Sequence, residues 1–164
     1  MKLLALFMFG VVVLVAGCGY DSEEKVVEEM LEKSTGGDTE VDITEQQVTI
    51  KGETEEGRYT VTGGEDIKLP EDFPADIAIY PAAKVISSMQ MQGGISLVMT
   101  SSDDKDKVTA TLKQEMGAKD WTVKQAMNMG TQSMLLFVKN ERNVNVSIGS
   151  MGNETQISIS VMKK

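Results

Sequence analysis

Strict alternation of apolar and polar residues through the second half of the chain is the feature that most limits its fold. Residue-by-residue alternation is typical of β-strands that bury one face only. The stretches with this pattern are 85–91, 95–100, 121–127, 133–139, 143–148 and 155–162. One stretch with helical spacing separates the second from the third. The pattern predicts an α+β fold for residues 84–164, in which one main helix covers the apolar face of an antiparallel sheet.

The sequence of residues 84–164 also contains signals for a turn and for the ends of the helix. Gly93-Gly94 separates the first two strands and predicts a hairpin. The helix is expected to begin after a cap at Ser101 or Ser102 and to stop at Gly117, because hydroxyl side chains cap helices and glycine ends them. Its buried stripe is expected to hold Val108, Leu112 and Met116.

The alternation assigns an inward set to each of the last four strands. The expected sets are Trp121 with Val123; Met134, Leu136 and Val138; Val144, Val146 and Ile148; and Ile157, Ile159 and Val161. The strand at 133–139 is apolar on both faces. Leu135 and Phe137 are therefore expected to need cover from the N-terminal half or from the proline-containing segment.

The N-terminal half differs in charge. Acids strongly outnumber bases between Gly19 and Asp76, whereas bases slightly outnumber acids afterwards. Residues 23–68 are expected to form a small subdomain of one acidic amphipathic helix and a β-meander. Such a thin meander needs cover, so it is expected to dock on the second half. Residues 69–83 hold all three prolines and predict an extended connector.

The first 17 residues have the three-part form of a secretory signal. Lys2 supplies the positive charge, Leu3 to Val15 are apolar apart from Gly10, and Ala16 and Gly17 are small. This apolar stretch is shorter than the roughly 20 residues that a membrane-spanning helix needs. It ends at Cys18, the only cysteine in the chain.

The sequence Val15-Ala16-Gly17-Cys18 resembles the lipobox of bacterial lipoproteins. The resemblance implies cleavage between Gly17 and Cys18, a lipid thioether on Cys18 with fatty acyl chains of the palmitate type, and residues 18–22 as a tether. Two or three acyl chains hold a protein stably on a membrane. The implied location is the bacterial cell envelope. Because Gly19 rather than aspartate follows the cysteine, the resemblance implies the periplasmic face of the outer membrane in a bacterium that has one.

A second resemblance covers roughly the second half of the chain. The sequence "LPEDFPADIAIYPAAKV" followed by a hairpin, a helix, "DWTV" and three strands resembles a C-terminal module of small bacterial envelope lipoproteins. This resemblance implies the sheet-plus-helix fold. It implies no activity and no site residues.

Composition argues against most enzyme classes. Histidine is absent, which removes the commonest proton-transfer side chain and transition-metal ligand. Adjacent acids such as Asp103 and Asp104 favour a solvated surface or a helix cap over a catalytic pair, and the acidic half disfavours nucleic acid. We therefore expect no catalytic residues and no cofactor. The expected role is noncatalytic binding or scaffolding, with the membrane and an envelope protein as partners.

Two surfaces leave alternatives open. The chain has 12 methionines, and the Met89-Met91 and Met127-Met129 pairs could offer thioethers to Cu(I), with Met99, Met116 and Met134 expected nearby. The favoured interpretation is that these pairs line the core, since residues two apart on a strand face the same way. A polar sheet face could bind glycan or peptide or simply face solvent. Its members are Ser88, Gln90, Thr100, Asn143, Asn145, Ser147, Ser158 and Ser160.

Overall fold

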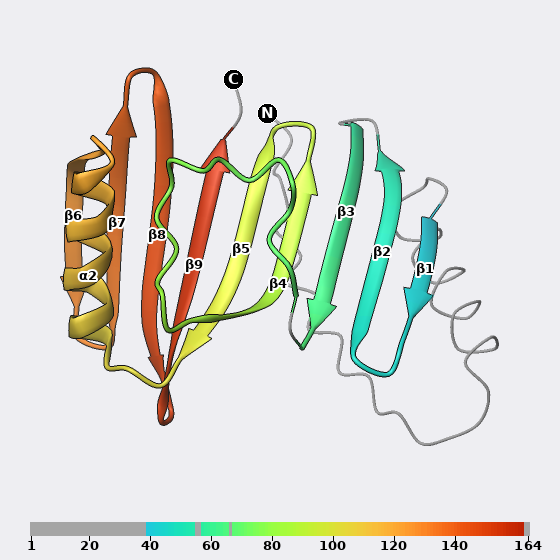
Figure 1. The fold of residues 1–164 in the computed structure, drawn as a ribbon, viewed down its shortest axis with the longest axis horizontal. Coiled ribbons are helices and arrows are strands. Elements are labelled where there is room, and N and C mark those ends of the chain that lie inside the picture. The colour runs from blue at the N-terminus through green and yellow to red at the C-terminus, as the bar shows by residue number, and fades with distance from the viewer. Residues whose placement is uncertain (1–38, 55–56, 66, 163–164) are drawn as a thin grey trace, which may run out of the picture.

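The computed structural model describes residues 39–54, 57–65 and 67–162. These residues form nine strands and one helix, α2 (Lys105–Ala118). The strands are β1 (Thr39–Ile43), β2 (Gln47–Thr54), β3 (Gly57–Gly64), β4 (Lys84–Met91), β5 (Gly94–Ser101), β6 (Thr122–Met129), β7 (Gln132–Lys139), β8 (Arg142–Met151) and β9 (Glu154–Met162). All lie in one antiparallel sheet of order β1-β2-β3-β4-β5-β9-β8-β7-β6 (Figure 1). The predicted α+β class is confirmed for the described part of the chain.

The N-terminal meander extends this sheet. β3 pairs with β4, with Val61 opposite Met89 and Tyr59 opposite Met91. We expected β1–β3 to dock on the second half. They do so edge to edge, because the edge of β4 offers backbone hydrogen bonds to β3. Tyr59 also lies over Gly52, its partner on β2, where a Cβ atom would come within 2.4 Å of the tyrosine hydroxyl.

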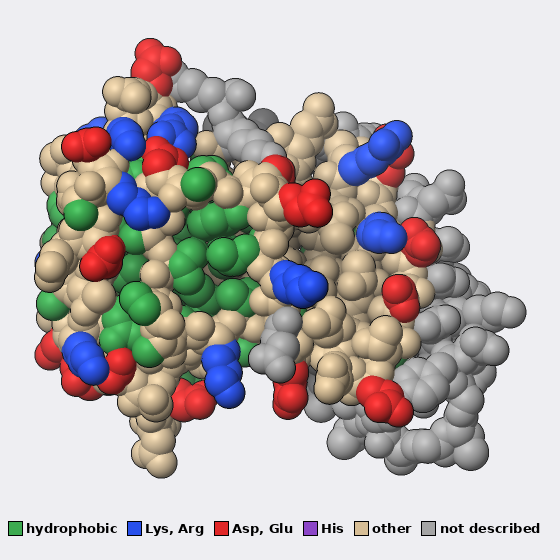
Figure 2. Space-filling model, in the orientation of Figure 1, with side chains coloured by type: hydrophobic (Ala, Val, Ile, Leu, Met, Phe, Trp, Pro, Cys, Tyr) green, Lys and Arg blue, Asp and Glu red, His purple; other side chains and the backbone are tan. Residues whose placement is uncertain are grey.

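One face of the sheet is covered by two segments of different kind. Helix α2 lies over β6, β7 and β8, and the connector between β3 and β4 runs over β8, β9, β5 and β4 (Figure 1). Figure 2 shows hydrophobic side chains gathered on this side between the helix and β4, whereas charged side chains are scattered over β1–β3. We call the covered side the inner face. The proline-containing segment is therefore part of the core layer, as expected.

The core lies between the inner face and these two segments. Phe137, Leu112 and Met99 have no exposed surface. The strand residues of the core are Met99, Leu135, Phe137, Val144, Val146, Ile148, Ile157, Ile159 and Val161; α2 adds Val108, Leu112 and Met116, and Ile77, Ala78, Tyr80 and Trp121 complete it. The predicted helix stripe and the inward sets of β8 and β9 are confirmed.

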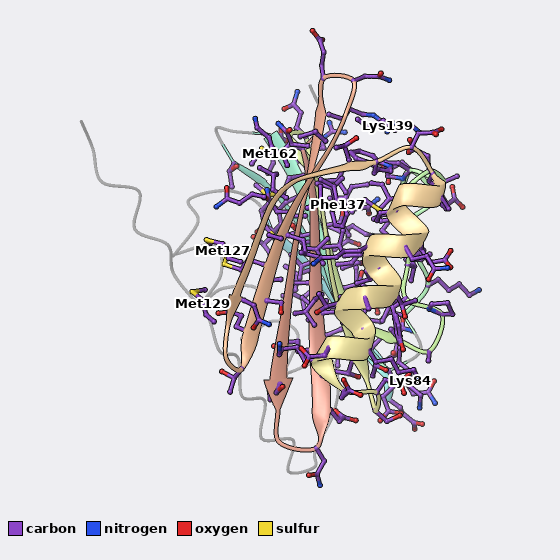
Figure 3. All side chains as sticks on the ribbon, turned by 90° about the vertical axis from the view of Figure 1, so that its left-hand side faces the viewer. Lys84, Met127, Met129, Phe137, Lys139 and Met162 are labelled. Carbon is purple, nitrogen blue, oxygen red and sulfur yellow. The ribbon has the colours of Figure 1, made fainter. Side chains whose placement is uncertain are left out.

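The inward set predicted for β7 is wrong. Leu135 and Phe137 are buried on the inner face, while Met134 on the opposite face is 41% exposed. Figure 3 shows Phe137 between the sheet and the helix. Leu135 pairs with Val146 and Phe137 with Val144, so register with β8 decides the face. Leu135 and Phe137 need no separate cover, because α2 packs against them.

Two local predictions also fail. Trp121 is buried, but Val123, although it lies opposite the core residue Phe137, is 38% exposed because β6 is an edge strand. The helix cap is Asp104, whose carboxylate accepts hydrogen bonds from the backbone N–H groups of Asp106 and Lys107. The helix also runs through Gly117 to Ala118, with its C-cap at Lys119.

Several predictions fall on residues outside the described ranges. These are the signal segment 1–17, the tether 18–22 with Cys18, and the acidic amphipathic helix. Within the described residues, no helix has the length and apolarity needed to cross a bilayer.

Because Phe137 and Leu136 point to opposite faces of β7, replacing each by alanine should have unequal effects on stability. Phe137→Ala should lower the free energy of unfolding by about 3–5 kcal/mol, because it leaves a cavity in the filled core. Leu136→Ala, on the other face, should cost about 1 kcal/mol, because that side chain is only partly buried. Urea unfolding followed by far-ultraviolet circular dichroism measures both. Equal losses, or a larger loss at Leu136, would contradict the assignment of faces.

Candidate binding face

The face opposite α2 carries exposed thioethers beside small polar side chains. Figure 3 shows Met127, Met129 and Met162 on the side of the sheet away from the helix. We call this side of β4–β9 the outer face. The residues at the centre of this face, which alternate with the core, are Met89, Met91, Ser96, Val98, Gln125, Met127, Met129, Met134, Leu136, Asn145, Ser147, Ser158, Ser160 and Met162. None of these side chains is charged.

A shallow groove of about 180 Å³ crosses the outer face. It is lined by Gln125, Met127, Met134, Leu135, Leu136, Asn145, Val146, Ser147, Ser158 and Ser160. Met127, Met134 and Leu136 supply an apolar wall from β6 and β7. Hydroxyl and amide groups from β8 and β9 supply a polar wall. The groove can therefore hold an uncharged ligand or segment that is apolar on one side and polar on the other.

Hydrogen bonds orient part of the polar wall. Ser96 and Ser160 share a hydrogen bond of 2.9 Å across β5 and β9. The amide of Gln132 donates to the hydroxyl of Ser147 at 3.0 Å, and the amide of Gln125 donates to the sulfur of Met127 at 3.4 Å. These contacts hold neutral groups at the groove.

The methionines are divided between core and surface. Met99 and Met116 are in the core, and the Met116 sulfur accepts a hydrogen bond of 3.3 Å from the backbone N–H of Ala78. The favoured prediction that Met89, Met91, Met127 and Met129 also line the core is wrong, since they are 36–54% exposed. Each pair shares a face as predicted, but it is the outer one. A bulge in each strand, between Val85 and Ser87 in β4 and between Val123 and Gln125 in β6, moves the pair that follows it to this face.

The predicted polar face is also divided. Asn145, Ser147, Ser158 and Ser160 lie together on the outer face, in the groove. Ser88, in contrast, is 7% exposed and lies opposite the core residue Leu97. A bulge between Val85 and Ser87 shifts β4 by one residue and turns Ser88 inward.

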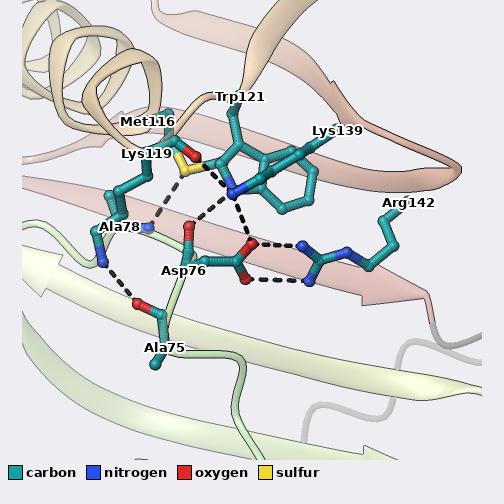
Figure 4. Close-up of polar contacts among 8 residues, drawn as sticks. All are labelled: Ala75, Asp76, Ala78, Met116, Lys119, Trp121, Lys139 and Arg142. Carbon is teal, nitrogen blue, oxygen red and sulfur yellow. Dashed lines mark hydrogen bonds and ion pairs between the residues drawn. The ribbon is translucent and has the colours of Figure 1, made fainter.

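On the inner side, ion pairs and hydrogen bonds fasten the connector over the core. Asp76 of the connector binds the guanidinium of Arg142 through both carboxylate oxygens, and Lys139 lies 3.1 Å from the same carboxylate (Figure 4). The Trp121 indole N–H donates to the Asp76 carbonyl at 2.7 Å, and Arg142 lies 5.0 Å from the centre of the Trp121 ring. We call these four residues the Asp76 clamp.

The cations of the Asp76 clamp shift its acid. Hydrogen bonding to Arg142, helped by Lys139, lowers the pKa of Asp76 from 3.8 to about 2, although burial acts in the opposite direction. The same pairing raises the pKa of Arg142. The carboxylate therefore stays charged at any physiological pH and holds the connector on the sheet.

The other acids considered in the sequence have structural partners. Asp104 caps α2, and Asp103 lies 2.7 Å from Lys107 and accepts a hydrogen bond of 2.5 Å from the hydroxyl of Tyr80. Pairing with Lys107 and then Tyr80 lowers the pKa of Asp103, while the bond to Asp103 and burial raise the pKa of Tyr80. Within the described residues, no group of three or more His, Cys, Asp or Glu side chains gathers as a metal site.

Lys105 is a buried cation that sequence reasoning missed. Its ammonium group donates to Asp106 at 2.7 Å and to Asn128 and Ser133 at 3.2 Å each. Ser133 is 2% exposed. These bonds tie the first turn of α2 to β6 and β7. The lysine and the serine are too enclosed to meet a substrate, so they hold the helix over the core.

A comparison with protein families found a match to the second half of the chain. A family model described as START domain-like matches residues 83–157, which run from β4 through α2 into β9. The chain is similar to that family over this stretch, a little under half of its length. Comparisons with curated proteins and with solved structures found no match.

The Asp76 clamp predicts a specific pH dependence of stability. Because the folded pKa lies below the unfolded value of 3.8, the clamp stabilises the fold fully above about pH 4 and loses this effect as the pH falls through about 2. At pH 7, Asp76→Asn should cost about 1–2 kcal/mol, less than for a fully buried pair because the groups are partly exposed.

Urea unfolding of both proteins between pH 7 and pH 2 measures this difference. The gap between wild type and Asp76→Asn should shrink as the pH falls below 4. A gap that stays constant over this range would show that ionisation of Asp76 contributes nothing to stability.

Proposed function

We propose that this protein is a lipid-anchored bacterial envelope protein that binds a ligand or partner, without catalysis, on the outer face of its sheet. The anchor is Cys18 after cleavage at Gly17, as the lipobox resemblance implies. The partner is an uncharged extended segment of an envelope protein or a ligand of similar chemistry.

The single observation that carries the binding role is the uncharged groove at the centre of the outer face. A quarter of the chain is charged, yet none of the groove residues is. Large apolar side chains remain exposed there, among them Met127 at 40% and Met134 at 41%. Exposed apolar patches rimmed by polar groups mark interaction sites in soluble proteins. Flexible, polarisable methionine side chains are favoured where a surface must adapt to a partner.

The family similarity supports the same role. START-like domains generally bind ligands rather than catalyse reactions. In this chain the space between helix and sheet is filled, since Leu112 and Phe137 have no exposed surface. A ligand is therefore expected on the outer face rather than beneath the helix.

The anchor is tested by replacing the one thiol. Cys18→Ser should move the protein from the membrane fraction to the soluble fraction, and mass spectrometry of the wild-type protein should show a lipid-modified Cys18 at the N-terminus. Several acyl chains are needed for stable attachment, so the change should be nearly complete. Retention of Cys18→Ser in the membrane fraction would refute the anchor.

The binding face is tested by photocrosslinking in cells at one groove position. A benzophenone amino acid in place of Met134 should give one dominant crosslinked product, whereas the same group in place of Lys113, exposed on α2, should not. Adding Ser147→Lys should abolish the product, because a charge in an uncharged groove costs desolvation. Equal products at both positions, or a product that survives Ser147→Lys in a protein shown to be folded, would contradict this role.

A further inference from the structure

The two Met-Xaa-Met pairs of the outer face have different neighbours. Met127 lies directly opposite Met134 on the adjacent strand, and Met129 follows two residues later on the same face. The side-chain neighbours of Met89 are Val61 and Ser96, and those of Met91 are Tyr59 and Gly94. Met162 lies one strand beyond Gly94. Three thioethers therefore adjoin at β6–β7, whereas the β4 pair has no third one beside it.

The spacing at β6–β7 allows the three sulfurs to converge. Side chains directly opposite each other on antiparallel strands have Cβ atoms about 4.5–5.5 Å apart, and residues two apart along a strand are separated by roughly 7 Å. Methionine has three rotatable side-chain bonds, so its sulfur can cover half of either distance. Met127, Met129 and Met134 are 40%, 54% and 41% exposed, which leaves them free to turn toward one ion.

The chemistry of three thioethers selects a particular kind of ion. Thioether sulfur is a soft, neutral ligand that favours Cu(I) and disfavours hard cations such as Ca²⁺ and Mg²⁺. The site has no proton to lose, so metal binding should not vary with pH near neutrality. The hydrogen bond from Gln125 to the Met127 sulfur uses one lone pair of that sulfur and leaves the other for a metal.

We propose that Met127, Met129 and Met134 form a Cu(I) site at the β6 edge of the sheet. This site needs thioether sulfur, whereas the proposed partner binding needs only an uncharged apolar surface. The two share Met127 and Met134 but need different properties of them, and a methionine-to-leucine change separates these requirements. Leucine keeps the apolar surface and removes the ligand atom.

The β4 pair supplies the matched control. The full chain carrying Cys18→Ser, so that no thiol competes, is titrated anaerobically with Cu(I) against a chromophoric chelator. One equivalent should bind more tightly than micromolar. Met127→Leu or Met134→Leu should weaken this binding at least about tenfold, while the double change Met89→Leu and Met91→Leu should leave it unchanged.

A second measurement identifies the ligand atoms directly. Ag(I), a soft ion without redox chemistry, should shift the methyl resonances of Met127, Met129 and Met134 in protein labelled at methionine methyl groups, and leave those of Met89 and Met91 in place. The proposal is overturned if no binding tighter than micromolar is found, if the β4 double variant weakens binding as much as Met127→Leu does, or if Ag(I) shifts the methionine methyls without distinction.

Discussion

Everything in this structure depends on one packed row of side chains on the inner face. Ile159, Val146 and Leu135 lie opposite one another across β9, β8 and β7, and α2 and the connector close over them. Because side chains alternate strictly along a strand, burying this row fixes which residues point the other way. Met134, Asn145 and Ser160 are on the outer face for that reason alone. The binding face is a consequence of how the core is filled.

Among the described residues, α2 and the connector share the task of covering the central strands of the sheet. Helix α2 reaches only β6, β7 and β8, and Ile77, Ala78 and Tyr80 of the connector cover the remaining central strands. An irregular segment must satisfy its polar groups as well as bury its apolar ones. The Asp76 clamp, the bond from Ala78 to the Met116 sulfur and the bond from Lys119 to the Ala75 carbonyl do so. Filled in this way, the inner side leaves the outer face as the place for a ligand.

Sequence reasoning succeeded where one face of an element was clearly apolar. The α2 stripe and the inward sets of β8 and β9 follow from composition and period. It failed at β7, where both faces are apolar and only the register with β8 decides which face is buried. It also failed at the bulges of β4 and β6, which reverse the alternation of inward and outward residues and have no signal in the sequence. The helix cap is Asp104 rather than Ser101 or Ser102, because each of the four consecutive polar residues 101–104 is able to cap a helix. The groove joins β6–β9, and no local pattern in the sequence shows that β5 pairs with β9.

The most direct test of this assignment of faces is the rate at which each methionine is oxidised in the purified folded protein. Hydrogen peroxide converts an accessible thioether to a sulfoxide, and peptide mass spectrometry follows each residue. Met127, Met129 and Met134 should be oxidised early, whereas Met99 and Met116, which are 0% and 1% exposed, should be protected until the protein unfolds. Oxidation of Met99 and Met116 as fast as Met127 and Met134 would contradict the account.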